Sequence, residues 1–388
     1  MTAIRLVFLA LGVALGSYLP YVAVIQSGKG FDPIAIGLIG AAGAALSVVA
    51  APVWGHLGDV SLGRRRVIQI ASLGATVAFL VFGVAALPLV LAGAWVTMSV
   101  FTSTTNPMAD AVAVVVVRQT PGASFARLRM LLSLGFGLTA ITTGLLYDGT
   151  GYGPAPFVAA GAFVLLAVTA RLVPDPPRDA AAHAAAGRRG GSTTAAFAAA
   201  PRLPMVLLAI GLGVVGIIAS FTYLPLRIEE LGGSPSDVAL ASGLESLAEV
   251  PAFVLFGALA PRIGNRGLFA LSGVLLAACL LALALLTSPA LMIGVRLITG
   301  VGYAGLTVAS VSALGMLLPA ALQSTGQSLN AMTWSVASIL LGLVGGTLYQ
   351  LAGAETLFAL TALLTLVAAA LGFAVLPPRV AVPSAERA

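Results

Sequence analysis

Charged residues are scarce in this sequence, and their scarcity excludes a water-soluble protein. Only 8% of the 388 residues are charged, whereas soluble domains carry roughly 25%. The sequence also lacks the alternation of polar and apolar residues that is typical of an outer-membrane barrel. Instead, 59% of the residues are hydrophobic and the mean hydropathy is +1.07. The apolar runs are long enough to cross a bilayer, so we predict an all-α membrane protein.

The residues that several chemistries require are missing as well. The single cysteine, Cys279, lies in an apolar run and cannot form an intramolecular disulfide. The two histidines, His56 and His183, are far apart, and neither belongs to a cluster typical of a metal site. No Gly-Lys-Ser/Thr loop for phosphate binding and no nucleophile–base arrangement stands out. We therefore expect no enzymatic activity, no metal and no cofactor.

Apolar segments separated by turn residues and charges predict twelve transmembrane helices. The predicted spans are 4–26, 34–57, 67–87, 89–116, 128–147, 156–173, 204–226, 236–260, 268–287, 290–317, 326–349 and 354–376. Residues 174–203 contain prolines, glycines, an alanine run and four arginines, which predicts a cytoplasmic linker between six spans and six spans. The predicted organisation is an N-terminal six-helix bundle at 1–173, this linker, a C-terminal six-helix bundle at 204–377 and a cytoplasmic tail at 378–388.

The distribution of basic residues predicts the orientation. With both termini in the cytoplasm, sixteen of the 19 lysines and arginines lie on the cytoplasmic side and two, Lys29 and Arg227, lie outside. The reverse orientation would invert the positive-inside rule. Because the basic residues sit in short loops, the net charge of +6 does not indicate a nucleic-acid partner. We expect a multi-pass protein of the cell membrane that contacts the lipid bilayer and functions as a monomer.

The two predicted bundles repeat one another. Pro33 opens the second span and Gly55 follows 22 residues later, and Pro235 and Gly257 show the same spacing 202 residues further along. Two related six-helix halves are a plan of transporters, which bind their substrate near the bilayer midplane at the interface of the repeats. The repeat therefore predicts two pseudo-symmetric bundles whose rocking gives alternating access.

The loop after the second span, with the sequence GHLGDVSLGRRR at 55–66, resembles the loop signature of the major facilitator superfamily. In that family the loop clamps neighbouring helices in one conformational state. The resemblance implies this conformational role for five residues, which are Gly55, Asp59, Gly63, Arg64 and Arg65.

Three other segments resemble the lactose permease and phenylpropionate permease branch of the superfamily, a group of nucleoside and oligosaccharide proton symporters. They are GSYLPY at 16–21, PMADA at 107–111, and FARLRM at 125–130 followed by Phe136. The resemblance implies that Asp110 and Arg129 bind a small-molecule substrate and that the ring of Phe136 stacks on it. The predicted tenth span lacks the histidine and glutamate of the branch's proton machinery, so galactoside specificity does not carry over.

The residues themselves partly support this site. A charge in hydrocarbon is costly unless it is paired or lines a wet cavity, so Asp110 and Arg129 are functional candidates. Arg129 and Phe136 are seven residues apart, which places them on one helix face. Three alternatives remain open: Arg129 as a cytoplasmic loop charge, Asp110 as its partner at a helix end, and Phe136 as packing.

Other polar residues in the predicted spans extend the candidate site. Tyr18 and Tyr21 in the first span, and Asn330 and Trp334 one helical turn apart in the eleventh, are expected to contact substrate. For Asn330 and Trp334, ordinary packing between helices is the alternative.

A second group of charges is a candidate for proton coupling. Glu245 and Glu249 are four residues apart in the eighth span, and two carboxylates so close do not both ionise readily in a low dielectric. We expect Arg296 of the tenth span to meet this pair, and we expect Asp110 to share in coupling, with a proton as the coupling ion. A static ion-pair network that fixes helix packing is the alternative.

These observations predict a secondary active transporter that moves a small solute, such as a sugar, a nucleoside or an aromatic acid, by proton-coupled symport. The alternative is a proton-coupled multidrug efflux carrier of the same fold, in which Asp110 would bind cationic lipophiles. Arg129 distinguishes the two, because a cavity-facing arginine favours anionic or hydroxyl-rich solutes.

The coupling role predicts the behaviour of two single variants. Glu245→Gln and Glu249→Gln each remove a titrating carboxyl while keeping its shape, so substrate-driven proton uptake should fall in at least one of them. The measurement is pH change outside vesicles on addition of substrate. Full coupling in both variants would refute the role of this pair.

Overall fold

The computed structural model describes residues 1–388 apart from 121–124, 174–192, 320–321 and 379–388. Within the described part, all assigned secondary structure is helical. The predicted linker at 174–203 falls largely, and the predicted tail at 378–388 almost wholly, outside the described residues. The helices of the first sequence half are α1 (Thr2–Gly16), η1 (Leu19–Tyr21), α2 (Val22–Gly28), α3 (Pro33–His56), η2 (Leu57–Ser61), α4 (Arg64–Val84), α5 (Pro88–Arg118), α6 (Phe125–Thr150) and α7 (Ala155–Ala170). Those of the second half are α9 (Thr193–Ala199), α10 (Leu203–Glu230), α11 (Pro235–Leu285), α12 (Pro289–Leu317) and α13 (Gln323–Val375).

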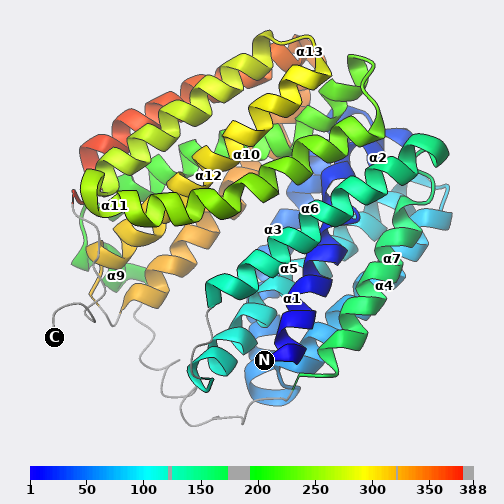
Figure 1. Cartoon of the computed structure of the whole chain (residues 1–388), viewed down its shortest axis with the longest axis horizontal. Coiled ribbons are helices and arrows are strands. Elements are labelled where there is room, and N and C mark those ends of the chain that lie inside the picture. The colour runs from blue at the N-terminus through cyan, green and yellow to red at the C-terminus, as the bar shows by residue number, and fades with distance from the viewer. Residues whose placement is uncertain (121–124, 174–192, 320–321, 379–388) are drawn as a thin grey trace. The chain divides into compact units, whose positions relative to one another are not determined.

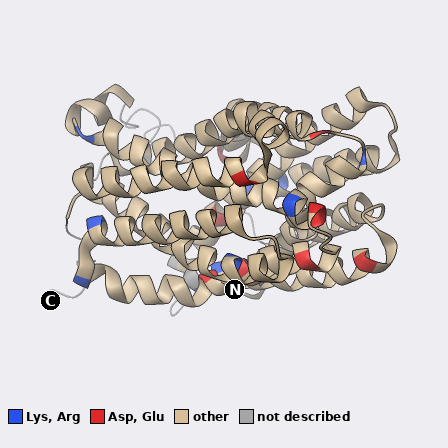
Figure 2. Cartoon of the chain, turned by 90° about the horizontal axis from the view of Figure 1, so that it is seen from above, with Lys and Arg blue, Asp and Glu red and all other residues tan. Residues whose placement is uncertain are grey.

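The described helices include nine segments long and apolar enough to cross a membrane, and a shorter apolar helix, α7. Two of the nine, within α11 and α13, are 51 residues long and bend at Gly264 and Gly353, where the backbone is not helical. Each is therefore long enough for two passes, since about 20 residues span the hydrocarbon core. This arrangement accommodates the twelve predicted spans, and charged residues are few along it (Figure 2).

Helix starts follow from local chemistry. Four of the long helices begin with proline, whose fixed φ and missing N–H suit the first helical position; they are α3, α5, α11 and α12. At α3 the Asp32 side chain also accepts a hydrogen bond from the Ala35 backbone N–H at 2.7 Å.

The chain packs as two compact units that do not coincide with the sequence halves. The first contains residues 1–183 together with 225–247, and the second contains 184–224 together with 248–388. In the first unit, α1 lies beside α6 and α7, and α4 lies beside α5 and α7 (Figure 1). Its core includes an aromatic cluster in which Phe79 contacts Tyr18, Trp95 and Phe163. The second unit has a mainly aliphatic core that is drawn from α9 to α13 and also contains Phe256 and Phe269.

The internal repeat is visible in the backbone. Among the described residues, those with positive φ are six glycines, and they form three pairs separated by 201 or 202 residues: Gly30 with Gly232, Gly63 with Gly264, and Gly151 with Gly353. Each pair marks the same turn in the two halves, because glycine adopts this conformation without steric cost. A tyrosine pair repeats as well: Tyr21 lies 5.1 Å from Tyr147, and Tyr223 lies 5.3 Å from Tyr349, between ring centroids.

Within the first unit, α6 and the start of α11 approach closely through small residues. An added Cβ at Gly144 would overlap the side chain of Ala239. Added Cβ atoms at Gly137 and Gly243 would each lie 3.1 Å from the carbonyl oxygen of the other residue. Small residues allow such backbone approach between membrane helices, and they explain why residues 225–247 pack with the first unit.

The close approach predicts opposite effects for two alanine substitutions on α6. Gly144→Ala should destabilise the protein by about 1–3 kcal/mol through overpacking against Ala239. Gly149→Ala is the matched control, because its added Cβ meets nothing within 4 Å and alanine favours the helix. Apparent melting temperatures in detergent should fall for the first and stay level or rise for the second. Equal melting temperatures would contradict the crossing.

Candidate functional site

The structure brings Asp110 of α5 and Arg129 of α6 together with a third polar residue, Asn106. Arg129 Nη1 donates to Asn106 Oδ1 at 3.0 Å and lies 3.5 and 3.4 Å from Oδ1 and Oδ2 of Asp110. The side chains of Arg129 and Asp110 are 45% and 32% exposed. These three residues are called the α5–α6 polar cluster below.

The ion pair of this cluster is loose. Strong N–H···O bonds between charged groups measure about 2.7–2.9 Å, which is shorter than the contacts of Arg129 with Asp110. A loose and partly exposed pair contributes little to stability, so its groups are free to rearrange around a ligand. Arg129 contacts two residues of the helix α5. Its role in binding a solute stays a prediction.

Phe136 lies two helical turns after Arg129 but in a different environment. It is buried, and the backbone at Phe136 packs against α1, where an added Cβ at Gly16 would overlap its carbonyl oxygen. Arg129, in contrast, is exposed. The substrate-stacking role of Phe136 stays a prediction.

The two tyrosines of the first span lie in the core of the first unit. Tyr18 packs edge-on against Phe79 at 5.0 Å between ring centroids. Tyr21 is fully buried, and its hydroxyl bonds the Ala140 carbonyl and the Thr143 hydroxyl. Both are therefore engaged within the bundle, and their contact with substrate stays a prediction.

In the second unit, Trp334 contacts Tyr303 edge-on, at 6.1 Å between ring centroids. The side-chain oxygen of Asn330, one turn earlier on α13, is buried and has no hydrogen-bond partner in the described structure. A buried amide oxygen without a partner is costly, which keeps Asn330 a candidate for ligand contact.

The residues predicted to couple transport to a proton differ in burial. Arg296 is 1% exposed, and its Nη1 donates to the Ser220 hydroxyl of α10 at 2.9 Å. Glu245 is buried and Glu249 is half-buried, one turn apart on α11. The meeting of Arg296 with this glutamate pair stays a prediction.

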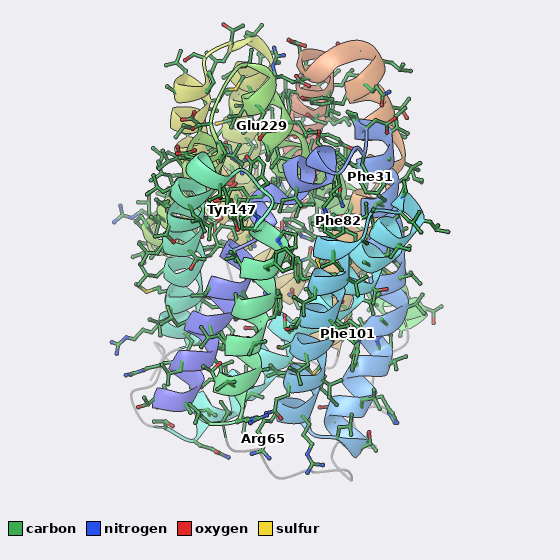
Figure 3. All side chains as sticks on the ribbon, turned by 90° about the vertical axis from the view of Figure 1, so that its right-hand side faces the viewer. Phe31, Arg65, Phe82, Phe101, Tyr147 and Glu229 are labelled. Carbon is green, nitrogen blue, oxygen red and sulfur yellow. The ribbon has the colours of Figure 1, made fainter. Side chains whose placement is uncertain are left out.

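The loop motif forms the local structure that its residues suggest. Gly63 has φ of 86° and precedes α4. Arg64 Nε pairs with Asp59 Oδ1 at 2.9 Å, and its Nη1 donates to the Ala111 carbonyl of α5 at 3.1 Å. Arg65, at the same end of the bundle, is half-buried (Figure 3).

Two glycines of this loop differ in their surroundings. An added Cβ at Gly55 would meet nothing within 4 Å, whereas an added Cβ at Gly58 would lie 3.0 Å from the Met108 sulfur. The close approach to a neighbouring helix is therefore at Gly58 and not at Gly55.

At the opposite end of the first unit, acidic side chains accept hydrogen bonds from the start of α11, and the long-range one of these contacts has no signal in the sequence. Asp148 Oδ1, at the end of α6, accepts a hydrogen bond from the Ser236 backbone N–H at 2.9 Å and so caps the first turn of α11. Ser234 and Asp237 form a reciprocal capping box at the same helix start. The spacing of Ser234 and Asp237 predicts that box, whereas the Asp148 contact spans 88 residues and has no local signal.

Glu229 lies at this same end, opposite Arg65 (Figure 3). It is half-buried at the end of α10. Burial, followed by the charge of Glu229, raises the pKa of the neighbouring Tyr152 hydroxyl, so this tyrosine stays protonated at physiological pH.

Comparison with solved structures defines the class of protein. A nucleoside transporter NupG variant is similar over 96% of this chain and 99% of that chain, with a TM-score of 0.82 and 15% identity. The D-xylose-proton symporter is similar over 97% and 98%, with a TM-score of 0.76 and 14% identity. A peptide transporter POT variant is similar over 96% of this chain and 93% of its own chain, with a TM-score of 0.75 and 14% identity. The fold is therefore that of the major facilitator transporters, which are multi-pass membrane proteins.

The sequence places the chain within that class. Residues 2–360 match the MFS_1 like family. The chain therefore belongs to this family. A comparison of the chain with curated protein sequences found no match.

The Asp148 contact predicts a graded effect of substitution. Asp148→Ala leaves the Ser236 N–H without its acceptor and should cost about 1 kcal/mol, whereas Asp148→Asn keeps an acceptor oxygen and should cost less. Apparent melting temperatures in detergent, with exposed Glu230→Ala as control, check this order. Asp148→Ala and Asp148→Asn should not melt alike; if they do, the cap is not formed.

Proposed function

We propose that this protein is a secondary active transporter that moves a small hydroxyl-bearing or anionic solute, such as a sugar, a nucleoside or an aromatic acid, by alternating access and proton-coupled symport. The α5–α6 polar cluster is the observation that carries this proposal. It offers an arginine and a carboxylate side by side, both partly exposed and loosely paired. Such a pair can donate to and accept from the hydroxyl groups of one ligand.

The NupG and D-xylose-proton symporter structures share the fold of this chain, and their names specify a nucleoside in one case and a sugar carried with a proton in the other. The substrate of this chain rests on its own residues.

The position of Arg129 supports uptake of such solutes over efflux of cationic lipophiles. A cation in the binding site repels a cationic drug and attracts hydroxyl or carboxylate oxygens. Arg129 bonds positions inside the spanning helix α5, eight and twelve residues before its last residue, Arg118. Glu245, Glu249 and Arg296 complete the proposal as the proton-coupling group, because buried carboxylates can change protonation as their surroundings change.

The proposal predicts a clear difference between two neighbouring arginines. In proteoliposomes, the wild-type protein should accumulate radiolabelled uridine or D-xylose by counterflow. Arg129→Ala should weaken apparent affinity about 10- to 100-fold, because hydrogen bonds to a charged group contribute about 1.5–3 kcal/mol. Arg127→Ala is the matched control, since this exposed residue lies two positions away on the same helix.

Arg129→Lys should recover only part of the affinity, because lysine keeps the charge but loses the planar fork. Wild-type vesicles that accumulate neither these probes nor an aromatic acid would argue against the function. Equal activity of the Arg129→Ala and Arg127→Ala variants would argue against the site.

A further inference from the structure

Asn106 makes the shortest contact in the α5–α6 polar cluster, although the sequence did not mark it as a site residue. We propose that Asn106 is a positioning and specificity-determining residue, which holds Arg129 through one guanidinium nitrogen so that the other two bind the hydroxyl groups of the solute. The inference rests on the proposed transport function and names a residue within its site.

The contacts of Arg129 are confined to one nitrogen. Nη1 bonds Asn106 Oδ1 and both oxygens of Asp110. Nε and Nη2 have no hydrogen-bond partner among the described residues. Neither atom is among the buried polar atoms without a partner, and the Arg129 side chain is 45% exposed. A guanidinium has five N–H groups in a fixed plane. Two belong to Nη1, so the three on Nε and Nη2 stay open to a ligand, in the geometry that binds paired oxygens.

The neutral amide is suited to this task because its charge does not change. A ligand hydroxyl that donates to Asp110, or a proton that binds it, weakens the hold of Asp110 on Arg129. Asn106 Oδ1 still accepts from Nη1 in either case, and it is the nearer acceptor, at 3.0 Å against 3.4 Å. The arginine therefore keeps its place while the carboxylate is engaged elsewhere.

The cluster occurs in one half of the repeat only. α5 begins at Pro88 and α12 at Pro289, 201 residues later, so Asn106 and Asp110 correspond to Thr307 and Val311. In α6, the helix after α5, Tyr147 corresponds to Tyr349 of α13, 202 residues later. The same separation pairs Arg129 with Ala331. Features that build the fold, such as the turn glycines and the tyrosine pairs, are present in both halves. A cluster present in one half is not needed for the shared architecture.

Two variants at Asn106 separate positioning from packing. Asn106→Ala removes the acceptor, whereas Asn106→Asp keeps an oxygen in the same place. The control is Ser103→Ala, an exposed residue on α5 whose hydroxyl bonds the Val100 carbonyl of its own helix. The readout is competition against labelled uridine counterflow by unlabelled uridine and by 2′,3′-dideoxyuridine, which lacks two hydroxyls.

The wild-type protein and the Ser103→Ala variant should prefer uridine over the dideoxy compound by about tenfold or more, since an unpaired polar site rejects an analogue that lacks its hydroxyl. In Asn106→Ala this preference should fall to near onefold, as in Arg129→Ala, with a raised KM and little change in kcat. Asn106→Asp should restore part of the preference, because it keeps an acceptor oxygen but its charge, unlike that of the amide, can change. The same comparison with D-xylose and a deoxyxylose applies if D-xylose is the transported probe.

A measurement without ligand tests the hydrogen bond itself. Melting temperatures of Asn106→Ala, Arg129→Ala and the double variant form a cycle, and the two single shifts should not add. Additive shifts, or an undiminished preference for uridine in Asn106→Ala, would overturn this inference alone. Wild-type vesicles that carry no probe would overturn the proposed function, and this inference with it.

Discussion

The cost of a charge in hydrocarbon governs where this protein places its polar groups. The chain has few charges, and those within its spans have specific surroundings. Arg296 is sealed in the second unit with the Ser220 hydroxyl at one nitrogen. Arg129 is half-open and shared between a carboxylate and an amide. The two arginines therefore suit different tasks, since a sealed cation can fix a network and an open one can exchange partners.

The internal repeat separates architecture from chemistry. Duplicated features, such as the glycine turns and the tyrosine pairs, answer problems that both halves share: how to reverse the chain and how to pack one helix on the next. The polar residues Asn106, Asp110 and Arg129 are not part of this shared architecture, because the corresponding residues of the second half are threonine, valine and alanine. Divergence between the halves is thus a guide to function that a single sequence can supply without any relative.

The sequence predicted the helical spans well because hydrophobic length and proline starts are local signals, and α3, α5 and α12 begin within a residue of expectation. It also predicted that Asp110 and Arg129 are near each other, through a family resemblance. It missed Asn106, because nothing local in the sequence shows that this residue of α5 contacts Arg129 of α6. Asp148 was missed for the same reason. The sequence also does not distinguish Gly58, which closely approaches Met108, from Gly55, which does not, because a glycine's neighbours depend on helix rotation.

The packing of residues 225–247 with the first unit has a mechanical consequence. α10 and α11 each contribute residues to both compact units. The change of unit in α10 falls at Pro225, and in α11 it falls four residues before Pro251. Proline removes a backbone hydrogen bond and lets a helix bend. Each helix therefore lacks a backbone hydrogen bond close to the residue at which it passes from one compact unit to the other.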